Sequence, residues 1–216
     1  VISRAEMLEA RPVPQDAMVV SQVSRWDPLK DHAGLAQAFC AHKLASSAHL
    51  ILAGPSPDAI SDDPEGRATL GDLRSCVESL PSRTRDRVHV ACLPMDDIEE
   101  NGAIVNALQR RSQIVVQKSL AEGFGLTVTE AMWKARPVVA SAVGGIQDQI
   151  QDGRDGVLVD DASDLSAFAS SIAQLLTDRS RAEAMGLLAH ESVLKNYLMP
   201  TYLERYLALI VEHVRT

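Results

Sequence analysis

The sequence predicts an α/β fold in which a parallel sheet is covered by helices on both faces. Short, continuously apolar runs alternate with segments of helical periodicity, and turns rich in glycine and polar residues follow the apolar runs. Runs without polar–apolar alternation indicate strands that are buried on both faces, which is typical of parallel sheets. With 216 residues, 46% of them hydrophobic, the chain can form one large domain of this class with an appendage.

The apolar runs define the expected strands, which cover residues 17–23, 49–53, 87–91, 113–117, 137–140 and 156–159. Apolar residues that recur every three or four positions define the expected helices, at 33–44, 68–80, 98–109, 126–134, 163–177, 179–196 and 201–214. Residues 55–67 are expected to form a loop, because they are rich in Pro, Asp, Ser and Gly. We expect a sheet domain over 1–196 and, over 197–216, a helix whose apolar side covers another surface.

Composition and residue spacing argue against several classes of function. The net charge of −8 argues against nucleic acid as a partner, and the lack of a run of about 18 apolar residues argues against a membrane span. The three cysteines are widely spaced and suggest buried thiols in a reducing cytoplasm. The histidines show no HxxxH or HExxH spacing, so no metal site is expected. Because the sequence begins at Val1 rather than Met, we expect it to be part of a longer protein.

The segment after the strand at 113–117 carries the clearest sign of a ligand site. Its turn, Glu122-Gly-Phe-Gly125, enters the helix expected at 126–134, and Glu130 lies inside that helix. Glycines let a ligand approach the backbone, and free N–H groups at a helix start suit a phosphate. One carboxylate could face a sugar while the other accepts hydrogen bonds from ribose hydroxyls. The alternative is that Glu130 only favours the helix dipole and Glu122 is a solvated loop residue.

Two cations follow the first expected strand, at the sheet edge where ligands of parallel α/β folds bind. Arg25 and Lys30 flank the turn Ser24-Arg-Trp-Asp-Pro-Leu-Lys30. Two positive charges there could neutralise a diphosphate, both in the ground state and as it gains charge on leaving. The alternative is a pair of surface cations beside a loop.

Two further turns admit a structural and a functional interpretation. Gly144-Gly145 follows the strand at 137–140 and could be an ordinary connection from strand to helix. The turn Asp62-Asp-Pro-Glu65 could hold a divalent cation. Adjacent aspartates and a proline also suit a solvated loop, which is the interpretation we favour.

Taken in order, these segments resemble one known pattern. Glu122 and Glu130, separated by seven residues and enclosing Gly-Phe-Gly, resemble the Glu-x7-Glu signature of the retaining glycosyltransferases of family 4. Arg25 and Lys30 resemble the Arg and Lys that this family places after the first strand of its C-terminal domain, and the turn at Gly54 also fits. The resemblance covers nearly the whole chain. It implies the Rossmann-like C-terminal half of a GT-B glycosyltransferase, with extra C-terminal helices.

The resemblance also implies roles in a site for a nucleoside-diphosphate glucose. Arg25 and Lys30 would bind the diphosphate, Glu130 the ribose hydroxyls, and Glu122 the hydroxyls of the donor glucose. The other donor contacts that it implies are the Gly54 turn, the backbone of Gly123, Phe124 and Gly125, the N–H groups of Leu126 and Thr127 at the helix start, and Cys92 and Leu93 near the base. Arg25, Lys30 and Glu122 would serve catalysis by front-face attack with retention, which requires no metal or other cofactor.

Within the family, the Asp62-Asp-Pro-Glu-Gly66 and Met132-Trp-Lys134 stretches most resemble the trehalose-forming members. These join glucose from a nucleotide donor, such as ADP- or UDP-glucose, to free glucose. The resemblance implies an N-terminal acceptor domain outside this sequence, a dimer of the full-length protein, and no sugar transfer by this chain alone. Alternatives are a family member with another acceptor, a nucleotide-sugar epimerase or hydrolase, and a non-catalytic nucleotide-sensing module.

Overall fold

The computed structural model describes residues 5–41, 44–57 and 63–214, and it contains one seven-stranded sheet in the order β1-β4-β3-β2-β5-β6-β7. The strands are β1 (Glu6–Leu8), β2 (Val19–Val23), β3 (His49–Pro55), β4 (Val88–Leu93), β5 (Ile114–Gln117), β6 (Val138–Ser141) and β7 (Val157–Val159). All neighbouring strands run parallel except β1, which pairs antiparallel to β4. The predicted α/β class with a largely parallel sheet is therefore confirmed.

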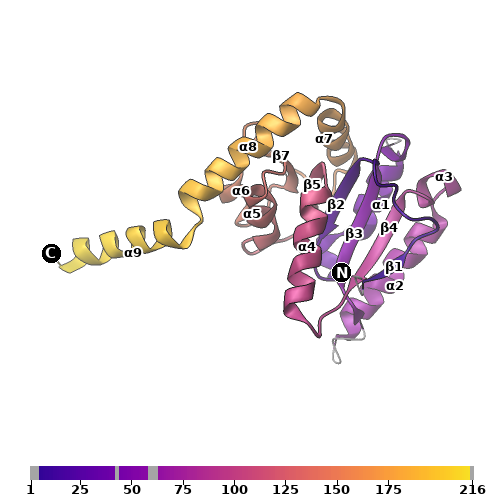
Figure 1. Ribbon diagram of the computed structural model, residues 1–216, viewed down its shortest axis with the longest axis horizontal. Helices are drawn as coiled ribbons and strands as arrows, with labels where there is room; N and C mark the ends of the chain where they lie inside the picture. Colours follow the sequence, from indigo (N-terminus) through magenta and orange to yellow (C-terminus); the bar gives the residue numbers. More distant parts are fainter. Residues whose placement is uncertain (1–4, 42–43, 58–62, 215–216) are drawn as a thin grey trace.

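Helices cover both faces of the sheet (Figure 1). They are α1 (His32–Ala41), α2 (Pro64–Ser79), α3 (Ser82–Arg85), α4 (Ile98–Arg111), α5 (Leu126–Trp133), α6 (Ile146–Gln149), α7 (Leu165–Thr177), α8 (Arg179–Asn196) and α9 (Met199–Val214), with 3-10 turns at Pro28–Lys30 and Leu44–Ser46. One apolar cluster joins the sheet to α1, α2 and α7, and two others join its opposite face to α4 and to α5, α6 and α8. All five residues of β2 are buried, as expected for a central strand.

The strand order places two loops side by side. Strand β2 lies between β3 and β5. From β2 the chain adds β3 and β4 on one side of β2, and it then crosses back to add β5, β6 and β7 on the other side. At such a reversal, the loops that follow the two central strands diverge and leave a crevice at the carboxyl edge of the sheet. The segments 24–31 and 118–125 therefore flank this position.

The structure corrects several expected boundaries. The polar segment 55–67 was expected to be a loop, but α2 already begins at Pro64, because Asp63 accepts a hydrogen bond from Gly66 N at 2.8 Å and proline suits the first helical position. Asp62, the first residue of the possible cation turn, lies outside the described residues. Helix α1 was expected to reach residue 44 but ends at Ala41.

Helix α9 extends away from the sheet and its helices (Figure 1). Its large apolar side chains are 45–75% exposed, and they are Met199, Tyr202, Leu203, Tyr206, Leu207, Leu209, Ile210 and Val211. An amphipathic helix normally buries such a face. The boundary between the sheet domain and the C-terminal helix at residue 197 stays a prediction. The exposed apolar face of α9 fits the expectation that this helix covers another surface.

Candidate functional site

The two loops at the reversal bring together Lys30 and Glu122, which were predicted to act on the same ligand. Lys30 Nζ lies 2.5 Å from Glu122 Oε2, and the two side chains are 12% and 14% exposed. Lys30 ends the 3-10 turn after β2, and Glu122 lies in the turn between β5 and α5. A lysine and a carboxylate that are ninety-two residues apart in sequence thus form one partly buried ion pair.

A hydrogen-bonded row of side chains continues from Glu122 to the start of α5. Ser119 Oγ donates to Glu122 Oε2 at 3.4 Å, and Gln117 Nε2 donates to Ser119 Oγ at 2.9 Å. Thr127 Oγ1 in turn donates to Gln117 Oε1 at 2.8 Å. Gln117 is buried at the end of β5, so it links the turn that carries Glu122 to the first turn of α5.

The backbone around Glu122 is held by a pair of glycines from the loop after β6. Gly144 has φ +52°, and a Cβ atom there would lie 1.8 Å from the carbonyl oxygen of Glu122. Gly145 N donates to Gly123 O at 2.8 Å. The Gly144-Gly145 turn is therefore more than an ordinary connection, because only a residue without a side chain permits this close approach.

The first turn of α5 leaves backbone N–H groups available for a ligand. Gly125, at its N-cap, has φ +86°, and no side chain caps this helix end. Leu126, the first helical residue, is 67% exposed. Free N–H groups at a helix start can bind anions, and the phosphate position at Leu126 and Thr127 stays a prediction.

The loop after β5 also carries a fully buried lysine, Lys118. Lys118 Nζ contacts Asp31 Oδ2 and donates to Ala162 O at 3.0 Å. Gln22, buried at the end of β2, donates to Lys30 O at 2.6 Å and accepts from Lys118 N at 2.8 Å. These contacts join the loops after β2, β5 and β7.

His32 is buried next to the same loop. Its Nε2 lies 3.0 Å from Ser24 Oγ, and its ring centroid lies 4.9 Å from that of Trp26. Burial lowers the pKa of His32 from 6.5 to about 4, although Asp31 and Asp27 oppose this shift. The ring is therefore neutral at physiological pH and adds no charge to the loop.

The remaining predicted residues lie around this centre. Arg25 has a 78% exposed side chain, and its Nη2 lies 3.5 Å from Asp27 Oδ2, so it does not contact Lys30 or Glu122 in this conformation. Glu130 is exposed on α5. Gly54 and Cys92 are register partners on β3 and β4, and Leu93 ends β4. Gly54 also has a packing function, because a Cβ there would lie 2.6 Å from the ring of Trp26.

Several residues of the site have no assigned role in the sequence-based prediction. They are Gln22, Asp31, His32, Gln117, Lys118 and Ser119. A signal was available for the last three, because a polar triplet directly follows an apolar strand. The partners of Lys118 could not be read in the same way, since one of them, Ala162, lies forty-four residues further along the chain.

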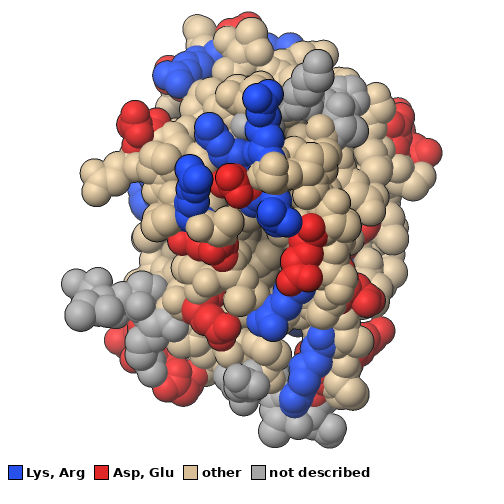
Figure 2. All heavy atoms as spheres, turned by 90° about the vertical axis from the view of Figure 1, so that its right-hand side faces the viewer, with Lys and Arg blue, Asp and Glu red and all other residues tan. Residues whose placement is uncertain are grey.

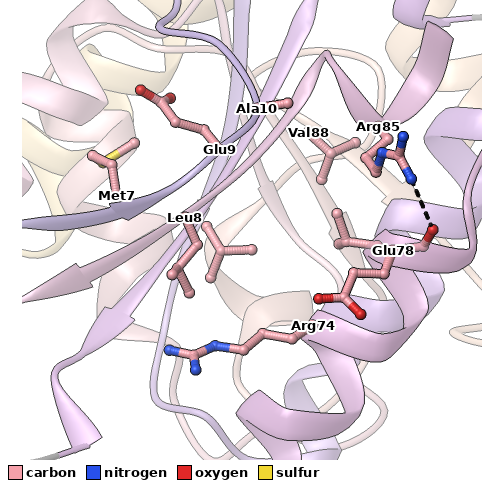
Figure 3. Close-up of a pocket in the computed structure, with 10 residues that line it drawn as sticks. Met7, Leu8, Glu9, Ala10, Arg74, Glu78, Arg85 and Val88 are labelled. Carbon is pink, nitrogen blue, oxygen red and sulfur yellow. Dashed lines mark hydrogen bonds between the residues drawn. The ribbon is translucent and has the colours of Figure 1, made fainter. Parts of the chain in front are cut away.

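A separate cavity of about 460 Å³ lies at the β1 edge of the sheet, between β1 and α2 (Figure 3). Leu8, Val88 and Val90 provide apolar lining, and Arg74 and Glu78 extend from α2 (Figure 3). The face with α2 and α3 carries basic side chains intermixed with acidic ones (Figure 2). None of the residues that line this cavity belongs to the loops after β2, β5 or β6, so it is distinct from the Lys30–Glu122 site.

Three observations on the described residues concern metal binding, membrane spans and the cysteines. Among residues 5–41, 44–57 and 63–214, no three His, Cys, Asp or Glu side chains are grouped so that they could hold a metal ion. Over the same ranges, no helix is both long enough and apolar enough to cross a bilayer. Of the three cysteines, Cys92 is buried, whereas Cys40 and Cys76 are only half-buried, which corrects the expectation of buried thiols.

The sequence model of the family described as Glycosyl transferases group 1 matches residues 3–191. The chain belongs to this family. It is 35% identical over 206 residues to the trehalose synthase of Pyrococcus horikoshii and 36% identical over 208 residues to that of Thermococcus litoralis. In both cases the match covers 94% of this chain but 46% of the relative. The chain thus spans about half the length of these relatives.

Solved structures are similar to this chain in fold. A sucrose-phosphate synthase from Thermosynechococcus elongatus is similar with a TM-score of 0.72 and 27% identity, over 94% of this chain and 47% of that one. Anabaena Alr3699/HepE in complex with UDP is similar with a TM-score of 0.70 and 20% identity, over 91% and 49% of the two chains. The fold of this group 1 member is that of the C-terminal domain of GT-B glycosyltransferases, with extra C-terminal helices.

Proposed function

We propose that this chain is the donor-binding half of a retaining glycosyltransferase that transfers glucose from a nucleoside-diphosphate glucose to glucose and forms trehalose. The observation that carries the proposal is the ion pair of Lys30 and Glu122 beside the uncapped first turn of α5. This arrangement offers a cation and free N–H groups for a diphosphate, and a carboxylate for sugar hydroxyls, within one small region.

The charges suggest how such a site would accelerate transfer. Negative charge grows on the diphosphate as the glycosidic bond breaks, and Lys30, Arg25 and the α5 N-terminus would stabilise it. Arg25, with its exposed side chain, would leave Asp27 and turn towards the phosphates. Departing phosphate oxygens would accept the proton of the attacking hydroxyl on the same face, which retains the configuration without a metal ion.

The other predicted contacts complete the donor site in this proposal. Glu130 on α5 would accept hydrogen bonds from the ribose hydroxyls. The base would lie near Cys92 and Leu93, at the end of β4, and Gly54 borders that position on β3. Contacts with backbone rather than side chains leave the base undetermined, so ADP-glucose and UDP-glucose are both candidate donors.

The choice of glucose as the acceptor rests on the similarity to the trehalose synthases named above. This chain matches about half of each relative, and that half would bind the donor. Another acceptor remains the alternative, since the chain is also 33% identical over 173 residues to a D-inositol 3-phosphate glycosyltransferase from Mycolicibacterium smegmatis. We propose that an N-terminal acceptor domain completes the enzyme and that the apolar face of α9 packs against it.

Calorimetric titration of this chain with ADP, UDP and GDP tests the donor site. We expect saturable binding of at least one diphosphate, weakened by Arg25→Ala and by Lys30→Ala and unchanged by EDTA. Arg154→Ala, which removes an exposed arginine that bonds to Gln151 outside the site, is the matched control. Wild-type affinity in both Arg25→Ala and Lys30→Ala would contradict the proposed charge neutralisation, and a loss of binding with EDTA would contradict metal independence.

A second experiment separates transfer from the alternatives. The protein that contains this chain together with its acceptor domain is incubated with labelled ADP- or UDP-glucose, with and without glucose, and the products are separated. Labelled trehalose that requires both glucose and the acceptor domain supports the proposal. Free labelled glucose or an isomerised donor in the absence of an acceptor would identify a hydrolase or an epimerase, and binding without turnover would identify a sensing module.

A further inference from the structure

Lys118 stands out because it is a lysine with no exposed surface in the middle of the predicted donor site. Its ammonium contacts the Asp31 carboxylate, donates to Ala162 O at 3.0 Å and lies 5.4 Å from the centroid of the Phe168 ring. Removing an ammonium from water costs several kcal/mol, and a buried ion pair often stabilises a protein no more than packed apolar residues would. Stability alone therefore gives little reason for a lysine here.

The partner of Lys118 determines the backbone next to Lys30. Asp31 follows Lys30 directly and has the left-handed conformation, with φ 38° and ψ 51°. Its Oδ1 accepts from Gly34 N at 2.9 Å at the start of α1, while its Oδ2 contacts Lys118. Such a conformation is uncommon for a residue other than glycine, so it needs contacts that hold it.

Two more bonds connect the same two segments. Gln22 joins the carbonyl of Lys30 to the N–H of Lys118, at 2.6 and 2.8 Å. Leu120 N donates to Leu29 O at 2.7 Å. The loop that carries Lys30 is thus attached to the β5 loop at residues 29, 30 and 31. Of these three attachments, the one between Lys118 and Asp31 joins two charged side chains.

We propose that Lys118 is a positioning residue that acts through Asp31 and fixes the backbone of Lys30 for the donor diphosphate. This inference rests on the proposed function of the site. In this structure the Lys30 ammonium is paired with Glu122, so on donor binding its side chain must turn to the phosphate. The buried contact of Lys118 keeps the backbone in place during this movement, and Lys118 itself does not touch the ligand.

The test compares Lys118→Met, Asp31→Asn and the double variant with the wild-type chain. Methionine retains much of the length of the side chain without its charge, and asparagine retains an oxygen for the bond from Gly34 N. Lys195→Met, in which an exposed lysine of α8 is replaced, is the matched control. Each variant is titrated with ADP, UDP and GDP, and its fold is checked by circular dichroism and urea unfolding.

We expect Lys118→Met to raise the dissociation constant by about tenfold, as for a loop that holds the binding geometry in about a tenth of the molecules. Hydrogen exchange should accelerate at the amides of residues 31, 34 and 35, whose partners are Pro28 O, Asp31 Oδ1 and Asp31 O, and not in the strands. The double variant should bind no more weakly than Lys118→Met, because both changes remove the same contact.

Wild-type affinity and unchanged exchange in a folded Lys118→Met chain would overturn the positioning role. If Lys118→Met does not fold, Asp31→Asn decides by the same two measurements. If the wild-type chain binds none of the diphosphates, the proposed donor site fails. Exchange at residues 31–35 then decides separately whether Lys118 fixes this loop.

Discussion

Replacing Gly144 by alanine should damage the site from a distance, through the backbone of Glu122. The new Cβ would lie 1.8 Å from Glu122 O and 2.8 Å from its carbonyl carbon. Neither neighbour is the end of a flexible side chain, so the two loops must move apart. The φ of +52° adds about 1–2 kcal/mol for a residue with a Cβ, and overpacking adds about 1–3 kcal/mol. We therefore expect a loss of about 2–5 kcal/mol of unfolding free energy.

Urea unfolding followed by circular dichroism measures this loss, and titration with a nucleoside diphosphate measures the effect on the site. Gly102→Ala is the matched control, because Gly102 lies inside α4 and a Cβ there meets nothing within 4 Å. The control should be more stable than wild type by about 0.5–1 kcal/mol, since alanine is the better helix former. A Gly144→Ala chain within about 0.5 kcal/mol of wild type would refute the argument from close approach.

Three further outcomes are expected. Because the pKa of His32 falls from 6.5 to about 4 on burial, the unfolded chain binds more protons in this window and stability falls as the pH falls. Between pH 7 and 5 the wild type should lose about 2 kcal/mol more unfolding free energy than His32→Asn, and equal losses would contradict this. Gln117→Leu should cost about 1–3 kcal/mol in urea unfolding, because the hydroxyl of Thr127 loses its acceptor and that of Ser119 loses a donor, and it should weaken diphosphate binding. The control is Gln147→Leu, whose side chain is exposed on α6. Asp63→Ala should lower the free energy of unfolding by about 1 kcal/mol, because it removes the N-cap of α2. Asp72→Ala, inside the same helix, is the control and should cause no such loss; thermal unfolding of both variants measures the difference.

The buried strands could be predicted from the sequence because each is a short, mostly apolar run between polar turns. Strand β1 was missed because its three residues, Glu6–Leu8, lie in a charged segment and pair with the distant β4. Helices α3 and α6 were missed because four residues are about one turn, too short to show a period. The start of α2 was missed because Asp-Pro suits both a turn and a helix cap.

The site was predictable where a residue type indicates chemistry and not where it depends on a distant partner. Lys30 and Glu122 were assigned to one ligand from their motifs; the structure places their side chains 2.5 Å apart, and the shared ligand stays a prediction. Lys118 and Gln117 have functions that depend on the strand order, which places the end of β5 next to the end of β2. That adjacency follows from the topology of the sheet, and no local pattern of residues specifies it.

The ion pair of Lys30 and Glu122 has a consequence for the order of events in a catalytic cycle. On the proposed roles, a donor that carries its sugar replaces this contact with two others, phosphate on Lys30 and hydroxyls on Glu122. After transfer, the bare diphosphate provides only the first of these. Glu122 then competes with the product for the ammonium of Lys30, which lies 2.5 Å from its carboxylate in this structure. The same carboxylate would therefore help to retain the substrate and to expel the spent nucleotide, so that product inhibition is reduced without a moving domain.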